Sequence, residues 1–520
     1  MNRRTQPRTS SSVIEEWPAR IAETALHLVE HQANSAMRSA LGDGPESLPL
    51  NKVRSITVAN ALRTDWSMVV EPTEHLFILG NPPFLGHATR VEKQAQELRD
   101  VWHRNDIGRL DYVTGWYAKS LDLFHRAGYA GQFAFVSTNS ITQGEPVPAL
   151  FGPLFADGWR IGFAHRTFAW TSEAPKAAAV HCVIVGFDKS PKERARIFYY
   201  KELRGPATEL AVREGINGYL VDGPNVLVEQ RRMPLSPELP LVAMGSMPRD
   251  GGNLIVNADG YDEVAADPVA AKYLRRFVMG KELIHDIPRW CLWLVDLDPA
   301  DVARSPILKR RLEAVRVFRA ASTAASTREM ASTPHLFGQR SQPSAPYVGI
   351  PSVFGEARRW ATCARLNAEV IAGNKIYMCQ DPDGFAFGIF SSSAFILWQK
   401  TVGGRLKSDP NFANTLVWNT FPLPQPTDEQ RAAIVVGGEA VLEARAQHPE
   451  RSLAEHYNPL AMDTALLKAH AALDKAVDAV FGLKGHVTEA ERIAALFASY
   501  QRLTTEGQLS LPVLKKHRKK

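Results

Sequence analysis

The feature that most constrains the fold is a series of short apolar runs that alternates with helical stretches between residues 51 and 188. Five runs have the length and composition of strands: VRSITVANAL, HLFILG, QFAFVSTNS, WRIGFAHRTF and AAVHCVIVGF. Helical periodicity over 110–127 and in PALFGPLFADGW separates several of them. The run HLFILG is nearly continuously apolar, as expected for a strand of a parallel sheet that is covered on both faces. This order predicts an α/β layered domain with a mainly parallel sheet.

Composition divides the rest of the chain. Residues 13–38 have apolar positions at helical spacing and predict a helix. An irregular, Pro-rich stretch within 190–250 marks the clearest boundary. We therefore expect the α/β domain to occupy 51–235, followed by a mixed α+β domain over 236–425 and a small helical region with a basic tail over 426–520.

Charge, cysteine content and hydropathy exclude several classes of protein. No stretch approaches the roughly 18 apolar residues of a membrane span, so no membrane partner is expected. The four cysteines form no CxxC pair, which favours buried free thiols in a cytoplasmic protein over a disulfide framework or a zinc site. The net charge of +6 comes partly from the tail LKKHRKK and permits a nucleic-acid partner without requiring one.

Residues 77–86 read FILGNPPFLG, in which two prolines and an aromatic residue follow a predicted strand. One interpretation is an ordinary turn, since Asn-Pro and Pro-Pro are common loop sequences. The other is an active site, because ligands of open parallel sheets bind at the carboxyl ends of the strands. Asp65 closes VANALRTD, and TFAW follows WRIGFAHR, so we expect three unusual stretches at one edge of one sheet.

NPPF after an apolar strand resembles the catalytic motif of N6-adenine-specific DNA methyltransferases. Resemblance to the MmeI-like restriction–modification proteins covers about residues 13–485. It rests on GNPPFLGHATR, RLDYVTGWYAKSLD, FAFVSTNSITQG, FAHRTFAWTSEAPKAAAVHCVIVGF, YLRRFVMGKELI, PRWCLWL, RLEAVRVFR, GRLKSDPNFANTLVWNTFPLP and LLKAHAALDKAVDAVFG. The resemblance implies a Rossmann-like class I S-adenosylmethionine-dependent methyltransferase fold, a target recognition domain over 236–425 and a helical region over 426–520. It also implies double-stranded DNA as partner, S-adenosylmethionine as methyl donor and no metal for methyl transfer.

The expected chemistry explains the residue types of NPPF. The N6 amine of adenine is a poor nucleophile, because its lone pair is delocalised into the purine ring. The side-chain oxygen of Asn81 and the carbonyl of Pro82 would accept its N–H groups and localise that lone pair. Pro82 and Pro83 would hold both acceptors in place by restricting the backbone. The adenine reaches them only by flipping out of the duplex, where Phe84 and, by the family pattern, Phe168 would stack on it.

Other candidate residues have competing interpretations. The resemblance places Asp65 near the adenine ring of the methyl donor, but an aspartate here also caps turns. Trp170 is a second candidate for base stacking, with local packing as its alternative. Asp111 and Tyr112 fit either a site role or the start of the helix that follows.

Basic residues of the recognition region are candidates for contacts to base edges or phosphates. They are Arg340, Arg358, Arg359, Arg405 and Lys407. For each of them, a solvated charged surface is the alternative.

The sequence departs from the family pattern at the donor site. A strand and a Gly-rich loop of the DPACGTG type should precede the helix at 13–38, but the residues before it lack glycine. Val13 takes the place of the acidic ribose contact. Residues 1–50 are therefore expected to be a remnant of the donor-binding part of an amino-terminally truncated methyltransferase. No lysine has Asp or Glu two positions before it, as a PD-(D/E)xK nuclease requires.

Two function classes remain open. The first is an adenine-N6 DNA methyltransferase of a restriction–modification system, which is either complemented by a separate chain that supplies the donor-binding loop or the nuclease, or only weakly active. The second is a catalytically inactive DNA-binding or specificity remnant of such a protein. A methylase of RNA or of protein glutamine is a third option, since NPP motifs serve these reactions too, but the large region after residue 235 favours DNA.

Overall fold

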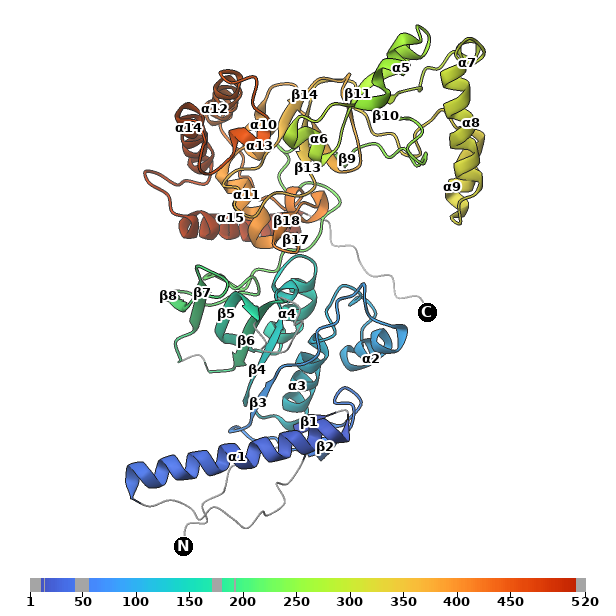
Figure 1. The fold of residues 1–520 in the computed structure, drawn as a ribbon. Coiled ribbons are helices and arrows are strands. Elements are labelled where there is room, and N and C mark those ends of the chain that lie inside the picture. The colour runs from blue at the N-terminus through green and yellow to red at the C-terminus, as the bar shows by residue number, and fades with distance from the viewer. Residues whose placement is uncertain (1–10, 14, 43–55, 171–179, 191–192, 511–520) are drawn as a thin grey trace, which may run out of the picture. The chain divides into compact units, whose positions relative to one another are not determined.

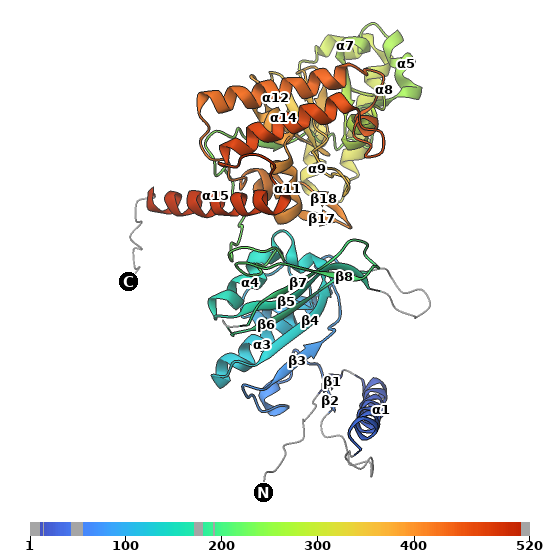
Figure 2. The same ribbon diagram turned by 90° about the vertical axis from the view of Figure 1, so that its left-hand side faces the viewer.

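The chain forms two compact units in its computed structural model (Figures 1 and 2). The structure describes residues 11–13, 15–42, 56–170, 180–190 and 193–510. The first unit extends to Leu227 without residues 143–145, which belong to the second unit together with Val228 and the residues after it.

The first unit is built around a six-stranded sheet with the strand order β3-β4-β6-β5-β7-β8. Helices alternate with its first strands, as the sequence predicts. The elements in chain order are β1 (Ser11–Val13), α1 (Glu16–Leu41), β2 (Ile56–Val58), η1 (Trp66–Met68), β3 (Phe77–Gly80), α2 (Glu92–Trp102), α3 (Thr114–Ala127), β4 (Gln132–Thr138), η2 (Asn139–Thr142), α4 (Pro146–Ala156), β5 (Arg160–Trp170), β6 (Val180–Asp188), β7 (Arg196–Tyr200) and β8 (Ala207–Leu210).

This sheet is mixed, which corrects the expectation of a mainly parallel one. β6 runs antiparallel to both β4 and β5, and β8 runs antiparallel to β7. A parallel connection needs a crossover of about a dozen residues or more, whereas only the nine residues 171–179 link β5 to β6. The chain therefore reverses direction there, and β3, β4 and β5 all point the same way.

Aromatic packing attaches α3 and α4 to one face of this sheet (Figures 1 and 2). The buried ring of Tyr117 in α3 lies edge-on to Phe133 of β4 and Phe187 of β6, with centroids 6.3 and 6.0 Å apart. Phe151 of α4 also packs on Phe187, at 6.1 Å. Because Phe133 and Phe187 are register partners, this aromatic cluster fixes the position of α3 and of the loop that precedes it.

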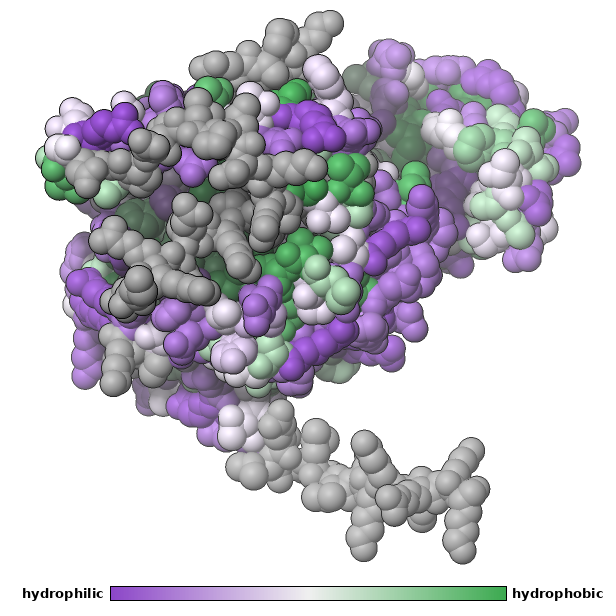
Figure 3. Space-filling view, turned by 90° about the horizontal axis from the view of Figure 1, so that it is seen from below, coloured by the Kyte–Doolittle hydropathy of each residue, from purple (hydrophilic) through white to green (hydrophobic). Residues whose placement is uncertain are grey.

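β3 is more exposed than the sequence HLFILG predicts. The side chains of Phe77 and Leu79 are 63% and 75% exposed. Their register partners are Gln132 and Ala134, so both point to the face opposite Phe133. The expectation of a strand covered on both faces is wrong, because β3 lies at the edge of the sheet and α3 and α4 cover the other face. Seen from below, the molecular surface has apolar green areas beside hydrophilic ones (Figure 3).

α1 and two short strands form a separate parallel β-α-β arrangement. β1 and β2 pair in parallel, and α1 connects them. The predicted helix over 13–38 is therefore present with slightly shifted bounds. From the described residues of the run VRSITVANAL, which begin at Ile56, the three residues of β2 form a strand. A turn begins at Asn60, whose carbonyl accepts the amides of Arg63 and Thr64.

The second unit contains two four-stranded sheets, a hairpin and a group of carboxyl-terminal helices. The sheets have the strand orders β10-β12-β11-β15 and β14-β13-β16-β9. Its elements are β9 (Val242–Met244), β10 (Ile255–Asn257), η3 (Ala258–Gly260), α5 (Tyr261–Ala266), η4 (Ala270–Tyr273), β11 (Leu274–Val278), α6 (Gly280–His285), β12 (Arg289–Leu292), α7 (Pro299–Arg304), α8 (Pro306–Ala320), α9 (Ala325–Glu329), η5 (Met330–Ser332), β13 (Tyr347–Pro351), β14 (Ala364–Leu366), β15 (Ile371–Ala372), β16 (Ile376–Gln380), α10 (Phe385–Phe390), α11 (Ser393–Val402), β17 (Gly404–Leu406), β18 (Asp409–Asn411), η6 (Asn414–Trp418), α12 (Asp428–Ala446), α13 (Leu453–His456), α14 (Thr464–Val480) and α15 (Glu489–Ser510).

All four cysteines are buried and free, as the sequence predicts. They are Cys182, Cys291, Cys363 and Cys379. Within the described ranges, no helix is both long enough and apolar enough to cross a membrane.

A fully buried arginine organises one part of the second unit. The guanidinium of Arg319 in α8 donates hydrogen bonds of 2.7 to 3.0 Å to five backbone carbonyls. The acceptors are Pro248, Arg249, Met330, Thr333 and Leu336. The planar, five-donor guanidinium matches this set of acceptors, so Arg319 ties α8 to the loops on both sides of it.

We expect Arg319→Lys to lower the free energy of unfolding by about 2–4 kcal/mol, because an ammonium group has three donors and leaves buried carbonyls unpaired. Urea denaturation followed by circular dichroism measures this change. Arg316→Lys, on the same helix with an exposed side chain paired to Glu313, is the matched control. Equal losses in the two variants would contradict the role given to Arg319.

Candidate active site

The carboxyl ends of β3, β4 and β5 lie at one edge of the six-stranded sheet. β3 is parallel to β4, and both β4 and β5 are antiparallel to β6. The NPPF loop therefore leaves the same edge as Asn139 after β4 and Phe168 near the end of β5. The topology confirms this convergence for two of the three stretches that the sequence singles out, NPPF and TFAW.

The NPPF loop presents Asn81 to solvent on a fixed backbone. The Asn81 side chain is exposed and makes no hydrogen bond with a described residue, whereas Pro82 is buried and Phe84 is half-buried. A Cβ at Gly80 would lie 3.3 Å from the ring of Phe135, so glycine lets the end of β3 pack tightly before the loop begins. The Asn81 amide is thus free to bind a ligand.

A buried carboxylate, Asp111, holds the residues that follow NPPF. Its Oδ1 atom accepts the amide of Leu85 at 3.0 Å, and its Oδ2 atom accepts the hydroxyl of Thr138 at the end of β4, also at 3.0 Å. The Tyr112 amide donates to the carbonyl of Leu85 at 3.1 Å. Asp111 therefore joins the end of the NPPF loop to the carboxyl end of the neighbouring strand.

Asp111 also has the helix-start role that the sequence suggests. Its Oδ1 atom accepts the amide of Val113 at 3.2 Å, just before α3. Tyr112 contributes to the same region by donating its hydroxyl to the buried Glu97 of α2 at 2.5 Å. The helix-start interpretation of Asp111 is thus confirmed, and one carboxylate has enough lone pairs for all three donors.

Phe168 lies in an aromatic cluster on β5 and β7. It packs on Tyr200 with centroids 5.3 Å apart and on Trp170 at 6.3 Å, and it remains half-buried. Tyr200 also contacts the imidazole of His165, at 2.9 Å from its hydroxyl to Nδ1. Burial lowers the pKa of His165, which favours the neutral ring in this cluster.

Asp65 does not lie at the end of a strand, so the position expected for it from the sequence is wrong. β2 ends at Val58, and Asp65 instead caps the short helix η1, accepting the amide and the hydroxyl of Ser67 at 3.0 and 2.8 Å. These bonds lower the pKa of Asp65. Its other oxygen is 3.8 Å from Arg126, in the last turn of α3, whereas NPPF lies near the start of that helix.

Asn60, and not Asp65, is the first polar residue after the carboxyl end of β2. It follows β2 by two positions and donates from Nδ2 to Glu97 at 3.1 Å, the same carboxylate that binds Tyr112. Its Oδ1 atom accepts the amide of Leu62 at 3.0 Å. Sequence reasoning missed Asn60 because VRSITVANAL was treated as one strand, although Asn is a turn residue that could have marked the end of β2.

Two of the five basic candidates for DNA contact are turned into the protein. Arg358 donates to the carbonyl of Tyr457, and Arg405 donates to the carbonyl of Ser408 at 2.8 Å and lies 3.7 Å from Glu356. Burial lowers the pKa of both guanidinium groups. These contacts use part of each guanidinium group within the fold, and a DNA contact of Arg358 or Arg405 stays a prediction.

The other three basic candidates are exposed. Arg340 donates to the carbonyl of Phe337 at 2.9 Å, and Arg359 lies over the ring of Trp360. Lys407 is at the tip of the β17–β18 hairpin with φ of 58°. Such a hairpin turn requires this left-handed backbone, so the side chain of Lys407 projects from the surface.

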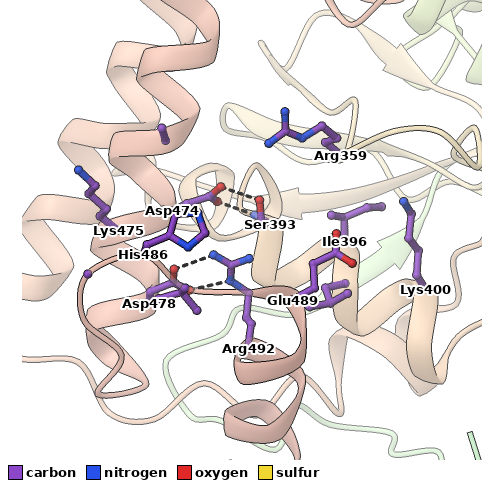
Figure 4. A pocket seen from close by; sticks show the side chains of 14 residues that line it. Arg359, Ser393, Ile396, Lys400, Asp474, Lys475, Asp478, His486, Glu489 and Arg492 are labelled. Atoms are coloured by element: carbon purple, nitrogen blue, oxygen red, sulfur yellow. Dashed lines mark hydrogen bonds and ion pairs between the residues drawn. The ribbon is translucent and has the colours of Figure 1, made fainter. Parts of the chain in front are cut away.

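A cavity of about 570 Å³ in the second unit lies next to Arg359 (Figure 4). Its charged side chains are largely paired: Asp474 accepts the amide and the hydroxyl of Ser393 at 2.7 and 2.5 Å, and Arg492 binds Asp478 through two bonds of 2.7 Å. Burial raises the pKa of Asp474. The network fastens α14 to α11 and α15, which is a structural role.

Comparison with known proteins agrees with this organisation. Three family profiles match successive parts of the chain: "MmeI, DNA-methyltransferase domain" over 12–199, "MmeI, target recognition domain" over 222–425 and "MmeI, C-terminal domain" over 426–507. The chain belongs to the MmeI family. The expected resemblance is thereby confirmed.

Two relatives match almost the whole of this chain. The Type IIL restriction-modification enzyme MmeI, solved in complex with DNA, is 40% identical with a TM-score of 0.81, covering 95% of this chain and 66% of MmeI. DNA methyltransferase A of Bacillus subtilis (strain 168) is 32% identical over 94% of this chain and 55% of the relative. The likeness to MmeI supports the expected Rossmann-like methyltransferase fold. This MmeI-family chain thus spans between about half and two thirds of the length of these relatives.

The described part of this MmeI-family chain holds no cluster of three or more His, Cys, Asp or Glu side chains that could bind a metal ion. The polar groups around NPPF are instead an exposed amide, backbone carbonyls and the anchored carboxylate of Asp111. Such groups can accept hydrogen bonds and position a ligand.

Asp111→Ala should release the loop after NPPF. We expect the Leu85 amide to exchange with solvent at least tenfold faster, and the free energy of unfolding to fall by about 2–4 kcal/mol, since three donors lose one buried acceptor. Hydrogen exchange with mass spectrometry and urea denaturation provide the two measurements. Asp106→Ala, which removes an exposed carboxylate paired with Arg104, should change neither quantity. Unchanged exchange at Leu85 in Asp111→Ala would contradict the role of Asp111.

Proposed function

We propose that this chain is the catalytic and target-recognition part of an adenine-N6-specific DNA methyltransferase of a restriction–modification system. In this proposal, residues 51–235 transfer the methyl group of S-adenosylmethionine to a flipped adenine in duplex DNA, and residues 236–425 select the target sequence. Membership of the MmeI family and the DNA complex of MmeI support it.

The observation that carries the proposal is the free amide of Asn81 at the carboxyl edge of the sheet. Its oxygen can accept one N–H of the adenine amine, and the backbone carbonyl of Pro82 can accept the other. Removing the lone pair from conjugation needs two acceptors held in place before the base arrives, and such preorganisation is a major source of catalysis. The buried Pro82 and the Asp111 contacts to Leu85 and Thr138 supply that rigidity.

Stacking residues complete the proposed base site. Phe84 follows the two prolines directly and is only half-buried, so part of its ring is open to a base. Phe168 leaves the same edge from β5, and its contacts with Tyr200 and Trp170 hold its ring. Trp170 thereby acts in packing, in line with its alternative interpretation. We propose that both phenylalanines flank the flipped adenine.

S-adenosylmethionine would supply an activated methyl group to the adenine nitrogen. Asp65 remains a proposed donor contact, now from a position beside α3 rather than from a strand end. A cavity of about 170 Å³ adjoins it, lined by Trp66 and by Lys119, Asp122 and Arg126 of α3. This pocket can accommodate only a small group, so the proposal needs further donor contacts beside NPPF.

A second candidate function is a DNA-binding remnant without methyl transfer. It is supported by one observation: residues 222–425 match a target recognition domain as a segment separate from the methyltransferase match. The two functions differ in donor binding. A chain that binds duplex DNA but shows no calorimetric binding of S-adenosylmethionine would establish the second one.

Asn81→Ala should reduce methyl transfer by at least about 100-fold, because it removes one of the two preorganised acceptors. The assay follows tritiated methyl groups from S-adenosylmethionine into a pool of duplex DNA. The melting temperature should not change, since the side chain is exposed. Asn105→Ala, another exposed asparagine of the same unit, serves as the control and should retain activity. Transfer to adenine that survives Asn81→Ala would refute the catalytic assignment.

Lys407→Ala should weaken binding to duplex DNA and reduce the salt slope of the affinity by about one, as expected for one lost phosphate contact. Fluorescence anisotropy over a range of salt concentrations measures both quantities. Arg405→Ala should instead lower the melting temperature, because its guanidinium bonds within the fold. Lys484→Ala, outside the recognition region, is the control for charge alone. An unchanged slope in Lys407→Ala would exclude a phosphate contact.

A further inference from the structure

The strand that carries Phe168 contains a β-bulge directly before this residue. His165 of β5 pairs with Ile184 of β6, whereas Phe168 pairs with Cys182. Three residues of β5 thus advance as far as two residues of β6. In a regular strand, residues three positions apart point to opposite faces of the sheet. The extra residue of the bulge instead places His165 and Phe168 on the same face.

Tyr200 on the neighbouring strand β7 contacts both of these residues. Its hydroxyl lies 2.9 Å from the Nδ1 atom of His165, and its ring centroid lies 5.3 Å from that of Phe168. Without the bulge, Phe168 would point to the other face and lose this contact. Bulges often redirect a side chain next to an active site, and the bulge in β5 directs Phe168 toward Tyr200.

The imidazole of His165 is held in turn by residues of β7. It stacks on Phe198, with ring centroids 4.5 Å apart and an angle of 14° between the ring planes. The guanidinium of Arg196 lies over the ring of Phe198 at 5.0 Å and pairs with Glu209 of β8 at 2.9 Å. A continuous series of contacts therefore extends from β8 through His165 and Tyr200 to the ring of Phe168.

The hydrogen bond between His165 and Tyr200 joins two neutral groups. Burial and the charge of Arg196 lower the pKa of His165, and burial raises the pKa of Tyr200. A neutral imidazole with its proton on Nε2 can accept the hydroxyl of Tyr200 at Nδ1. This bond restricts the position of the tyrosine ring, on which Phe168 packs.

Phe168 lies level with the anchored end of β4. Cys182 of β6 pairs with Phe168 on one side and with Thr138 on the other. The hydroxyl of Thr138 donates to Asp111, the carboxylate that also accepts the amide after NPPF. The supported aromatic residue and the fastened loop therefore lie at the same level of the sheet.

We propose that Tyr200 and His165 are positioning residues, which hold the ring of Phe168 in the orientation that stacks on the flipped adenine. The inference rests on the proposed function and adds to it the residues that prepare one side of the base site. Stacking on an aromatic ring stabilises an unpaired base. A ring that is already fixed before the base arrives loses less conformational freedom on binding. Tyr200 and His165 act through Phe168 and need not touch the base.

The first test compares the steady-state kinetics of methyl transfer to duplex DNA. Base flipping follows DNA binding, so a poorly held Phe168 lowers the reactive fraction of the bound DNA. We expect Tyr200→Ala to lower kcat at least about fivefold, with less than about a twofold change in KM for DNA. Phe168→Ala should show the same pattern with a larger loss. Tyr199→Ala, which removes the neighbouring side chain on the opposite face of β7, is the control and should retain kcat.

Conservative variants separate the hydrogen bond from the ring contact. Tyr200→Phe retains the ring beside Phe168 and loses the hydroxyl, so it should recover most of the activity that Tyr200→Ala loses. His165→Phe retains an aromatic ring next to Phe198 and loses Nδ1. Each variant should lower kcat about two- to threefold, and the double variant should be no worse than either, because both remove the same bond. Additive losses in the double variant would overturn the role given to this bond.

The second test observes the ring of Phe168 without DNA or methyl donor. Incorporation of 4-fluorophenylalanine at position 168 gives a fluorine resonance for NMR spectroscopy. We expect one narrow resonance in the otherwise unchanged chain and in Tyr199→Ala. In Tyr200→Ala the resonance should broaden or split, because the ring loses its support. An identical resonance in Tyr200→Ala would overturn the proposal.

The two measurements distinguish this inference from the proposed function. If the unchanged chain transfers no methyl group, the proposed function fails, and the fluorine resonance still decides whether Tyr200 holds Phe168. If Phe168→Ala impairs transfer while Tyr200→Ala has full kcat, the function stands and the positioning role is overturned. A rise in KM without a fall in kcat in Tyr200→Ala also overturns it, since the tyrosine would then act in DNA binding.

Discussion

The proposed site depends on one buried carboxylate. NPPF has no regular backbone hydrogen bonding of its own, so its position must be fixed from outside. Asp111 does this by accepting the amide of Leu85, the amide of Val113 and the hydroxyl of Thr138. Three segments that are distant in sequence thereby share one acceptor. The exposed Asn81 can remain free for a ligand because these neighbouring bonds, and not its own side chain, hold the loop.

Strand direction then decides which residues can act together. β3, β4 and β5 share a direction only because β6 runs against its neighbours, which brings NPPF and Phe168 to one edge. Asp65 does not lie at this edge. The chain turns at Asn60, and Asp65 lies beside Arg126 in the last turn of α3. Predicting a site at strand ends therefore requires the correct strand length. Because β2 ends a few residues earlier than the sequence predicts, Asp65 caps η1 and does not lie at the strand end.

Arginines in the second unit show how burial redirects charge. Arg319, Arg358 and Arg405 donate to backbone carbonyls and join loops to helices. In such places, guanidinium groups donate to several carbonyls at once, which stabilises irregular segments. Side chains that project from the surface, such as Lys407 at a hairpin tip, remain the proposed contacts to DNA. The basic composition alone does not distinguish these two uses.

The sequence by itself determined the α/β order, the family, the NPPF loop after a strand and the buried thiols, because these follow from local hydropathy, turn chemistry and contiguous motifs. Only the tertiary structure decided that β3 is an exposed edge, that Asp111 fastens the loop, that Asp65 caps η1 and that Arg358 and Arg405 point inward. The physical reason is that strand neighbours and hydrogen-bond partners lie far apart in the chain. Asp111 is 26 residues from Leu85 and 27 from Thr138, and no local pattern records which groups will meet.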